Sequence, residues 1–600
     1  MCGIIGALGN FSNSTFIEAV NKIKHRGPDF TGYVSVNNNK INNYKDDEEQ
    51  FLDNNSKISF AHLRLSIIDL EEHSNQPFIK HNKILIFNGE IYNYIELRKE
   101  LEKLGYTFFT NSDTEVLISS FEAWGEKCVN KFNGMWAFSI YDLNTKKLFL
   151  SRDRFGIKPL YYFHSNNLFA FASEIKSLYK IDQVITSPNI DQISHYLFWG
   201  LQEVQPDTLF TNIYKLLPGQ NMIYDYNINK TNISQYYSLD NIKEEKNSLN
   251  TIVSNLKQKF KDSINLRMRA DVPVAVSLSG GLDSSSILME SDEISNYKQK
   301  TFSIVYDKEH NNIDESKWIN IVNNIYKTEN HKTIPKYEDL RDDLEEFLYT
   351  YDEPIRGTTF FAQWSLMKLI HSKDIKVSLE GQGGDEVFGG YLYTLMINDF
   401  LNNFIKNHLN TTKLYLLKTF FYMLFPNLYE KILSYKVKRK LNFKRKIPKN
   451  MNKTFRHKLN INSLLKHELS SGIRLLLKKV DRASMHFSIE SRVPYLDYKL
   501  VEYALSIPSK MKIHNGWTRY LQRKMFDKRL NDEIVWRKNK LGFPTPHKEW
   551  VKQLSSDKEI INLIKNSKLL KELDIKIDIE DTNFKWKIIN IAIWEKLYWN

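Results

Sequence analysis

The strongest constraint on the fold is an arrangement that occurs twice in the second half of the chain. The glycine-rich segments SLSGGLDSSS (277–286) and LEGQGGDEVFGGY (379–391) each follow a short apolar run, VPVAVS or IKVS. Further apolar runs, such as KTFSIVYD, alternate with helical stretches, a pattern typical of a parallel sheet wound with helices. Because ligands bind at the carboxyl ends of such strands, both loops are predicted to face one crevice.

The first loop carries the residue types that bind a phosphate. Gly280 and Gly281 allow the backbone to approach a ligand, and the following helix directs free N–H groups at an anion. Ser279 and Ser284 add hydroxyl donors. Asp283 would repel a phosphate unless a cation lay between them, so it predicts Mg²⁺. No Gly-Lys-Ser/Thr sequence closes the loop, which excludes the Walker type.

The second loop supplies a matching carboxylate. It places five glycines, among them Gly381, around Asp385 and Glu386. We expect Asp283 and Asp385 to share Mg²⁺ bound to the phosphates of a nucleotide. The alternative, which either loop taken alone would favour, is a strand–turn–helix connection capped by Ser and Asp.

The first half of the chain has a different pattern of predicted strands and helices. Residues 1–180 contain short strands ending in turn signals, with helices predicted near 92–104 and 113–127, which indicates an α+β domain of antiparallel sheets. Residues 225–250, rich in Asn, Lys and Ser, are interpreted as a linker. The predicted domains are therefore 2–215 and 240–600, the latter mostly helical from 392 and carrying a helical, basic insertion at 392–470.

Cysteine content and hydropathy predict the compartment. Two cysteines among 600 residues exclude a disulfide framework and indicate a reducing environment. Residues 1–10 lack a secretory signal pattern, and the most apolar stretch, LYLLKTFFYMLF (414–425), is too short to span a bilayer and contains a lysine. We expect a cytoplasmic protein without a transmembrane segment.

The net charge of +13 is unevenly distributed, because the tract 431–458 is rich in Lys and Arg and has no Asp or Glu. Such a tract could bind RNA or an anionic membrane surface. The alternative is a solvated insertion. No RNA-binding aromatic motif or paired zinc pattern accompanies the tract, so no nucleic-acid partner is expected.

The second half resembles the ATP pyrophosphatases of the asparagine synthetase family. The motifs that carry the resemblance are the Ser-Gly-Gly-x-Asp-Ser loop, DRASMHFSIESRVPYLD (481–497), GWTRYLQR (516–523) and WRKNKLGFPTP (536–546). The family activates a carboxylate as an acyl-adenylate and releases pyrophosphate, so the resemblance implies ATP as substrate. Lys540 matches its catalytic lysine, and Arg356, after DEP (352–354), matches a position near the acceptor. The second loop departs from the family pattern, with Glu380 and Gln382 where familiar members carry serine and an acidic residue. Either Glu380 takes the acidic role, or the loop belongs to a subgroup with altered chemistry.

Together with Cys2, four segments resemble the class II glutamine amidotransferases: HRGPD (25–29), HLRLSIIDL (62–70), NQPF (75–78) and FNGEIYN (87–93). This resemblance covers residues 2–180 and implies an N-terminal-nucleophile αββα sandwich that hydrolyses glutamine.

The resemblance also implies the site residues. Cys2 is the nucleophile, and once Met1 is removed its own α-amino group serves as base. The Asn88 side chain and the Gly89 N–H stabilise the oxyanion. Arg64 binds the carboxylate of glutamine. The substrate ammonium is bound by the acidic pair, Glu90 and Asp113.

The two resemblances together predict glutamine-dependent synthesis of asparagine from aspartate and ATP. One alternative is an amidotransferase of the same family acting on another carboxylate, for example a cell-envelope sugar. A second is an RNA- or membrane-binding protein on a retired enzyme scaffold. Relatives also suggest a homodimer.

Overall fold

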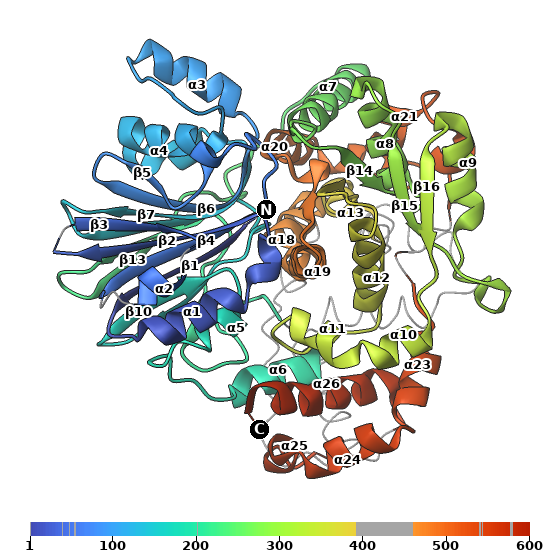
Figure 1. The fold of residues 1–600 in the computed structure, drawn as a ribbon. Coiled ribbons are helices and arrows are strands. Elements are labelled where there is room, and N and C mark those ends of the chain that lie inside the picture. The colour runs from blue at the N-terminus through green and yellow to red at the C-terminus, as the bar shows by residue number, and fades with distance from the viewer. Residues whose placement is uncertain are drawn as a thin grey trace.

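The computed structural model shows two domains side by side, with the start of the chain at their junction (Figure 1). The described residues are 2–38, 40–46, 48–52, 56–200, 202–391, 460–538, 542, 544–575 and 580–599. Lys540, the basic tract 431–458 and most of the predicted 392–470 insertion lie outside these ranges. Among the helices within them, none combines the length and the apolar character needed to cross a bilayer.

Two antiparallel sheets form the first domain. Across the first sheet the strands are β11 (Ile213–Lys215), β9 (Tyr161–His164), β10 (Leu168–Ala172), β1 (Gly3–Gly9), β4 (Ile58–Arg64), β2 (Phe30–Asn37) and β3 (Lys40–Lys45). Across the second they are β13 (Lys230–Gln235), β12 (Gln220–Asp225), β8 (Lys147–Arg152), β7 (Gly134–Asp142), β6 (Lys83–Ile91) and β5 (Phe78–Lys80). The second sheet thus contains two strands beyond residue 215, and the outer one, β13, lies within the stretch 225–250 interpreted as a linker.

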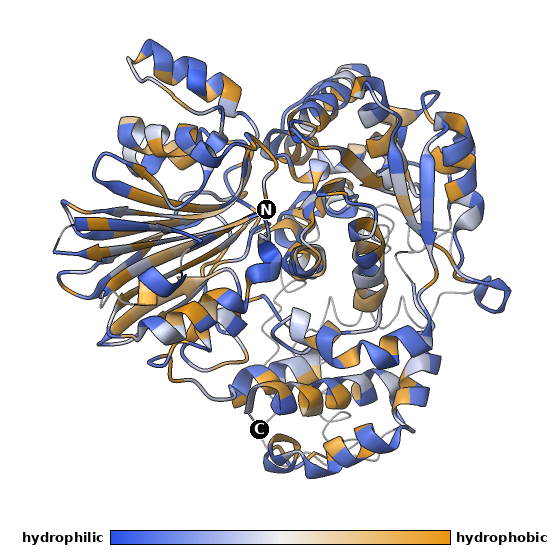
Figure 2. Cartoon of the chain, viewed as in Figure 1, coloured by the Kyte–Doolittle hydropathy of each residue, from blue (hydrophilic) through white to orange (hydrophobic). Residues whose placement is uncertain are grey.

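Side-chain alternation builds this domain into four layers. In β1, Ile4 and Leu8 pack between the sheets, whereas Ile5 and Ala7 point to the helices on the other face. Helices α1 (Asn13–Asn21), α2 (Glu48–Leu52), α5 (Ile175–Leu178) and α6 (Ile190–Trp199) pack against the first sheet, and α4 (Asp113–Trp124) packs against the second. Helix α3 (Tyr94–Lys103) extends from this layer and is largely hydrophilic (Figure 2). The predicted αββα sandwich is confirmed.

A parallel sheet forms the centre of the second domain. Its described strands run in the order β16 (Glu329–Thr333), β15 (Lys300–Ile304), β14 (Val274–Ser277), β17 (Val377–Leu379) and β18 (Glu490–Arg492), and every neighbouring pair is parallel. The inner strands β14 and β17 are buried throughout, while the edge strand β16 is hydrophilic (Figure 2). The predicted parallel α/β arrangement is confirmed.

Helices surround this sheet and make up most of the C-terminal part, as predicted. Helix α7 (Leu249–Arg267) precedes the first of these strands. Between the strands lie α8 (Leu282–Ile294), α9 (Ser316–Tyr326), α10 (Tyr337–Asp342), α11 (Leu344–Thr350), α12 (Thr359–His371), α13 (Gly384–Phe388), α18 (Ile461–His467) and α19 (Ile473–His486). After β18 follow α20 (Tyr498–Ser506), α21 (Tyr520–Phe526), α22 (Asp532–Val535), α23 (His547–Leu554), α24 (Lys558–Asn566), α25 (Lys568–Glu572) and α26 (Thr582–Trp599).

Candidate active sites

Cys2 lies directly before β1, with its side chain buried at the inner end of the sandwich. Its backbone nitrogen donates a hydrogen bond to Asn88 Oδ1 on β6, at 3.2 Å. Burial raises the pKa of the thiol, so a nearby base must remove its proton before attack. The other cysteine, Cys128, is fully buried in the core beneath α4, where burial likewise raises its pKa.

Asn88 and Gly89 lie beside the nucleophile on β6. The Asn88 Nδ2 group is buried and has no hydrogen-bond partner among the described residues. A Cβ at Gly89 would lie 2.1 Å from the Met135 carbonyl oxygen, and φ is +154°, so only glycine fits this position. An amide donor that is buried and unpaired matches the requirement of an oxyanion hole.

Arg64, at the end of β4, is held by the loop that follows it. Its guanidinium donates hydrogen bonds to the Glu71 carbonyl at 2.9 Å, to Asn75 Oδ1 at 2.6 Å and to the Asp69 carbonyl. Its positive charge partly opposes the rise that burial causes in the pKa of the Cys2 thiol. The loop therefore fixes the guanidinium close to the nucleophile, as binding of a substrate carboxylate would require.

Glu90 and Asp113 form a buried acidic pair. Asp113 begins α4 and accepts a hydrogen bond from the Ile91 backbone N–H at 2.8 Å, and burial raises its pKa to about 6. Burial, together with the charge of Asp113, raises the pKa of Glu90 well above its ordinary value. Arg492 of the second domain approaches Glu90 to within 4.0 Å. A bound ammonium would allow both carboxylates to ionise.

Arg26 connects this site to the second domain. Its guanidinium is fully buried and donates to the Cys2 carbonyl at 3.2 Å and to Glu174 at 2.7 Å. It also donates two hydrogen bonds, of 3.1 and 3.2 Å, to the carboxylate of Asp481 on α19. The nucleophile is thereby tied to the helix that leads to the second site.

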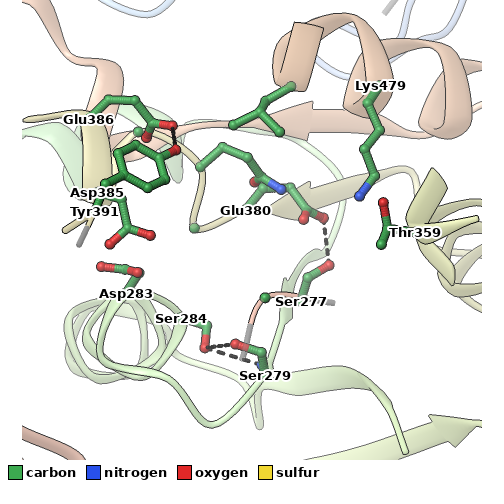
Figure 3. A pocket seen from close by; sticks show the side chains of 15 residues that line it. Ser277, Ser279, Asp283, Ser284, Thr359, Glu380, Asp385, Glu386, Tyr391 and Lys479 are labelled. Atoms are coloured by element: carbon green, nitrogen blue, oxygen red, sulfur yellow. Dashed lines mark hydrogen bonds between the residues drawn. The ribbon is translucent and has the colours of Figure 1, made fainter. Parts of the chain in front are cut away.

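The second site is a cavity of about 260 Å³ at the carboxyl ends of β14 and β17 (Figure 3). Its described lining residues are Ser277, Ser279, Asp283, Ser284, Thr359, Glu380, Gly381, Gln382, Gly383, Asp385, Glu386, Tyr391, Leu476, Lys479 and Gly542. Both glycine-rich loops contribute, which confirms that they face one crevice. They also touch: a Cβ at Gly384 would lie 2.5 Å from Asp283 Oδ1.

The first loop is closed by its own hydroxyls. Ser284 Oγ lies 3.1 Å from both the backbone nitrogen and the Oγ of Ser279. Gly280, with φ +67°, packs against Trp318, where a Cβ would approach to 2.6 Å. Gly281 then caps the start of α8. The loop has the shape of an anion cradle at a helix N-terminus.

Asp283 and Asp385 lie on either side of one guanidinium. Arg519 Nη1 is 3.1 Å from a carboxylate oxygen of each. Gln522 Nε2 donates to Asp283 Oδ1 at 2.7 Å. No group of three or more His, Cys, Asp or Glu side chains suited to a metal occurs in the described part of the chain. Two carboxylates nevertheless fit Mg²⁺, which is commonly held by one or two carboxylates together with substrate phosphates.

Glu380 lies in the middle of the cavity wall (Figure 3). Its Oε1 accepts hydrogen bonds from Ser277 at 2.5 Å and from Ser378 at 3.1 Å, and burial raises its pKa to about 7. Gln382 also lines the cavity, and its buried Oε1 has no hydrogen-bond partner among the described residues. The carboxylate in this part of the loop is therefore that of Glu380.

Two cations, Arg356 and Lys479, differ in their position relative to this cavity. Arg356 does not line the described cavity. It lies beside Gly200, where an added Cβ would be 3.3 Å from Arg356 Nε, and Lys587 is close to the same position. Lys479, which the sequence analysis missed, does line it. The only signal for Lys479 was its place two residues before the motif DRASMHFSIESRVPYLD (481–497), which does not say where the ammonium points.

In comparisons with known proteins, two different family models match the two halves of the chain. The family model described as "Asparagine synthase" matches residues 255–591, and that of a "Glutamine amidotransferase domain" matches residues 36–237. The chain is 31% identical to "Asparagine synthetase [glutamine-hydrolyzing] 1" of Bacillus subtilis, over 100% of this chain and 97% of the relative. It is 35% identical to "Putative asparagine synthetase [glutamine-hydrolyzing] 2" of Methanocaldococcus jannaschii, over 68% and 78% of the two chains.

Proposed function

Because the chain belongs to the asparagine synthase family, we propose that its two sites carry out glutamine-dependent asparagine synthesis. Glutamine is hydrolysed to glutamate and ammonia in the first domain. In the second, ATP adenylates the side-chain carboxylate of aspartate with release of pyrophosphate, and ammonia then displaces AMP to give asparagine. The observation that carries this function is the pairing of a buried Cys2–Asn88 site with the two-loop cavity, joined through Arg26 and Asp481.

For glutamine hydrolysis, we assign the base to the α-amino group of Cys2 after removal of Met1. The reference pKa of an α-amino group, about 7.7–8.0, leaves part of it neutral near pH 7.5. Asn88 and Gly89 donate to the oxyanion. Arg64 binds the carboxylate of glutamine, and the acidic pair of Glu90 and Asp113 binds its ammonium. The unpaired Asn88 amide and the raised pKa values of the acidic pair support these roles.

For adenylation, we assign the first loop (Ser279, Gly280, Gly281, Ser284) and Gly381 of the second to ATP. Asp283 and Asp385 would hold Mg²⁺ together with the phosphates of ATP. Bound there, the metal would neutralise charge on the phosphates as pyrophosphate leaves. The contact of Arg519 with both carboxylates supports the choice, because it marks the gap between them as a place for positive charge.

For amide formation, we assign proton transfer from the attacking ammonia to Glu380. A carboxyl with a pKa of about 7 is balanced between its two forms near neutral pH, which suits a general base. Gln382 cannot ionise and so cannot take this part. Lys540 is assigned to stabilise charge on the adenylate, and Arg356 to the acceptor side, on the family resemblance alone.

The two alternatives to asparagine synthesis are not favoured by the family matches. The test is an acceptor panel with ATP, Mg²⁺ and ammonia, in which pyrophosphate and amide products are measured for aspartate, glutamate and a uronic acid. We expect an amide from aspartate. Pyrophosphate release with the uronic acid and not with aspartate would support the sugar-amidating alternative instead. A cytoplasmic location and a homodimer remain predictions, the second testable by light scattering.

A further inference from the structure

The cavity of the second domain has two chemically different ends (Figure 3). Asp283 and Asp385 lie at one end, beside the loops that we assign to the nucleotide. Lys479 and Thr359 lie at the other end, and Glu380 is between the two. An acceptor whose reacting carboxylate meets the α-phosphate beside these loops would have the end with Lys479 available for its other groups.

Lys479 is the one basic side chain among the described residues that line this cavity. It is on α19, is only 6% exposed, and passes over the ring of Phe360, whose centre is 5.5 Å from Nζ. Figure 3 shows its ammonium directed toward Thr359 and Glu380. Burial lowers its pKa to about 8, while the charge of Glu380 favours the ammonium form. A buried ammonium aimed into a cavity is suited to an anionic ligand.

Aspartate brings such an anion. Its side-chain carboxylate is used in the adenylate, and its α-carboxylate must then be buried in the cavity. An unpaired carboxylate in such a place is costly unless a cation is near. A uronic acid has a single carboxylate, the reacting one, and needs no second cation.

We propose that Lys479 binds the α-carboxylate of aspartate and so selects a dicarboxylic amino acid as acceptor. This inference rests on the proposed function and adds a specificity-determining residue to it. The ammonium also interacts with the charge of Glu380, whose carboxylate accepts hydrogen bonds from Ser277 and Ser378.

The experiment measures ammonia-dependent pyrophosphate release, so that the glutaminase site is not involved. Lys479→Met is expected to raise the KM for aspartate on the order of 10- to 100-fold, the loss of one charge-assisted hydrogen bond, with the KM for ATP changed less than about twofold. Lys479→Arg keeps the charge and is expected to recover part of the loss. Lys261→Met, which removes a half-exposed lysine paired with Glu293 on the surface, is the matched control.

β-Alanine, which is aspartate without its α-carboxylate, is the decisive probe. The wild-type enzyme is expected to prefer aspartate, and Lys479→Met is expected to lose that preference because its kcat/KM falls far more for aspartate than for β-alanine. The inference is overturned if the variant keeps the preference, or if its KM rises for ATP and not for aspartate. If Lys479→Met does not fold, Lys479→Gln replaces it in the same comparison. Failure of the wild-type enzyme to use aspartate at all would refute the proposed function itself.

Discussion

Cys2 shows how a residue of ordinary type gains a function from its surroundings. Its buried thiol has a raised pKa, and the nitrogen beside it already contacts Asn88. Removal of Met1 converts that nitrogen from an amide into an amine, the form that can take a proton. In the proposed mechanism, the nucleophile and its base thus come from the same residue.

Cys2→Ala is predicted to abolish asparagine formation from glutamine and to leave formation from ammonia within about twofold of the wild-type rate. The ammonia reaction needs only the second site, which the substitution does not touch. Both rates are measured by asparagine production. Cys128→Ala, at the buried cysteine without catalytic neighbours, is the control and keeps both activities. Glutamine use by Cys2→Ala would place the nucleophile elsewhere.

The acidic pair predicts pH-dependent binding of glutamine. Burial raises the pKa of Asp113 to about 6, so this carboxyl becomes neutral as the pH falls through 6 and no longer attracts the substrate ammonium. Glutamine affinity of Cys2→Ala protein, measured by calorimetry, is therefore expected to weaken below pH 6, by up to about tenfold per pH unit. Asp113→Asn is expected to bind weakly with less pH dependence. A flat profile for the Cys2→Ala protein would contradict the assignment.

For single residues, the sequence predicted which side chains line the cavity in some cases and missed others. Asp283 and Asp385 follow glycine-rich loops directly, so strand direction alone brings them to one edge. Lys479 and Arg356 are on or beside helices, where the direction of a long side chain depends on packing. Sequence motifs therefore pointed to Arg356, whereas the cavity contains Lys479.

Among the structural elements, the two glycine-rich loops together form most of the wall of the second cavity. Gly384→Ala would place a Cβ 2.5 Å from Asp283 Oδ1 and push the loops apart. Adenylation, measured as pyrophosphate release, is predicted to fall by up to about 100-fold, because displacements near 1 Å misalign reacting groups. Glutaminase activity should stay within about twofold.

The control for this change is Gly357→Ala, whose Cβ would meet only His547, at 3.9 Å. It is expected to keep adenylation near the wild-type rate. Equal losses in the two variants would show that the contact between the loops is not what adenylation depends on.

Element prediction succeeded where burial produces a clear pattern. The apolar runs at 274–277 and 377–379 are the inner strands of the parallel sheet, as predicted. The hairpin of β12 and β13 was missed, because β13 is an exposed edge strand with the sequence KTNISQ. An edge strand with polar residues on its exposed face has the composition of a linker.

In the whole molecule, buried ion pairs join the two domains. Arg26 of the first domain contacts Asp481 of the second, and Arg482 contacts Glu174 at 2.8 Å. All four side chains are at most 3% exposed. Arg26 also holds the Cys2 carbonyl, so the interface and the glutaminase site share one residue. We infer that domain docking and glutamine use are coupled through it.

Asp481→Asn is predicted to weaken docking, because it leaves Arg26 with an incomplete partner in a buried place, at a cost of about 3–5 kcal/mol. The yield of asparagine per glutamate should fall, as ammonia escapes before reaching the adenylate. Lys376→Met removes the half-exposed interdomain pair with Asp29, worth about 0–1 kcal/mol, and should keep the wild-type yield. An unchanged yield in Asp481→Asn would separate docking from ammonia transfer.

We propose that the two sites form one enzyme that passes ammonia from glutamine to activated aspartate. The most direct test quantifies glutamate, asparagine, AMP and pyrophosphate in one reaction with glutamine, ATP, Mg²⁺ and aspartate. We expect equimolar asparagine, AMP and pyrophosphate, with glutamate matching them when glutamine is the only nitrogen source. Glutamate formed without asparagine, while pyrophosphate is absent, would contradict it.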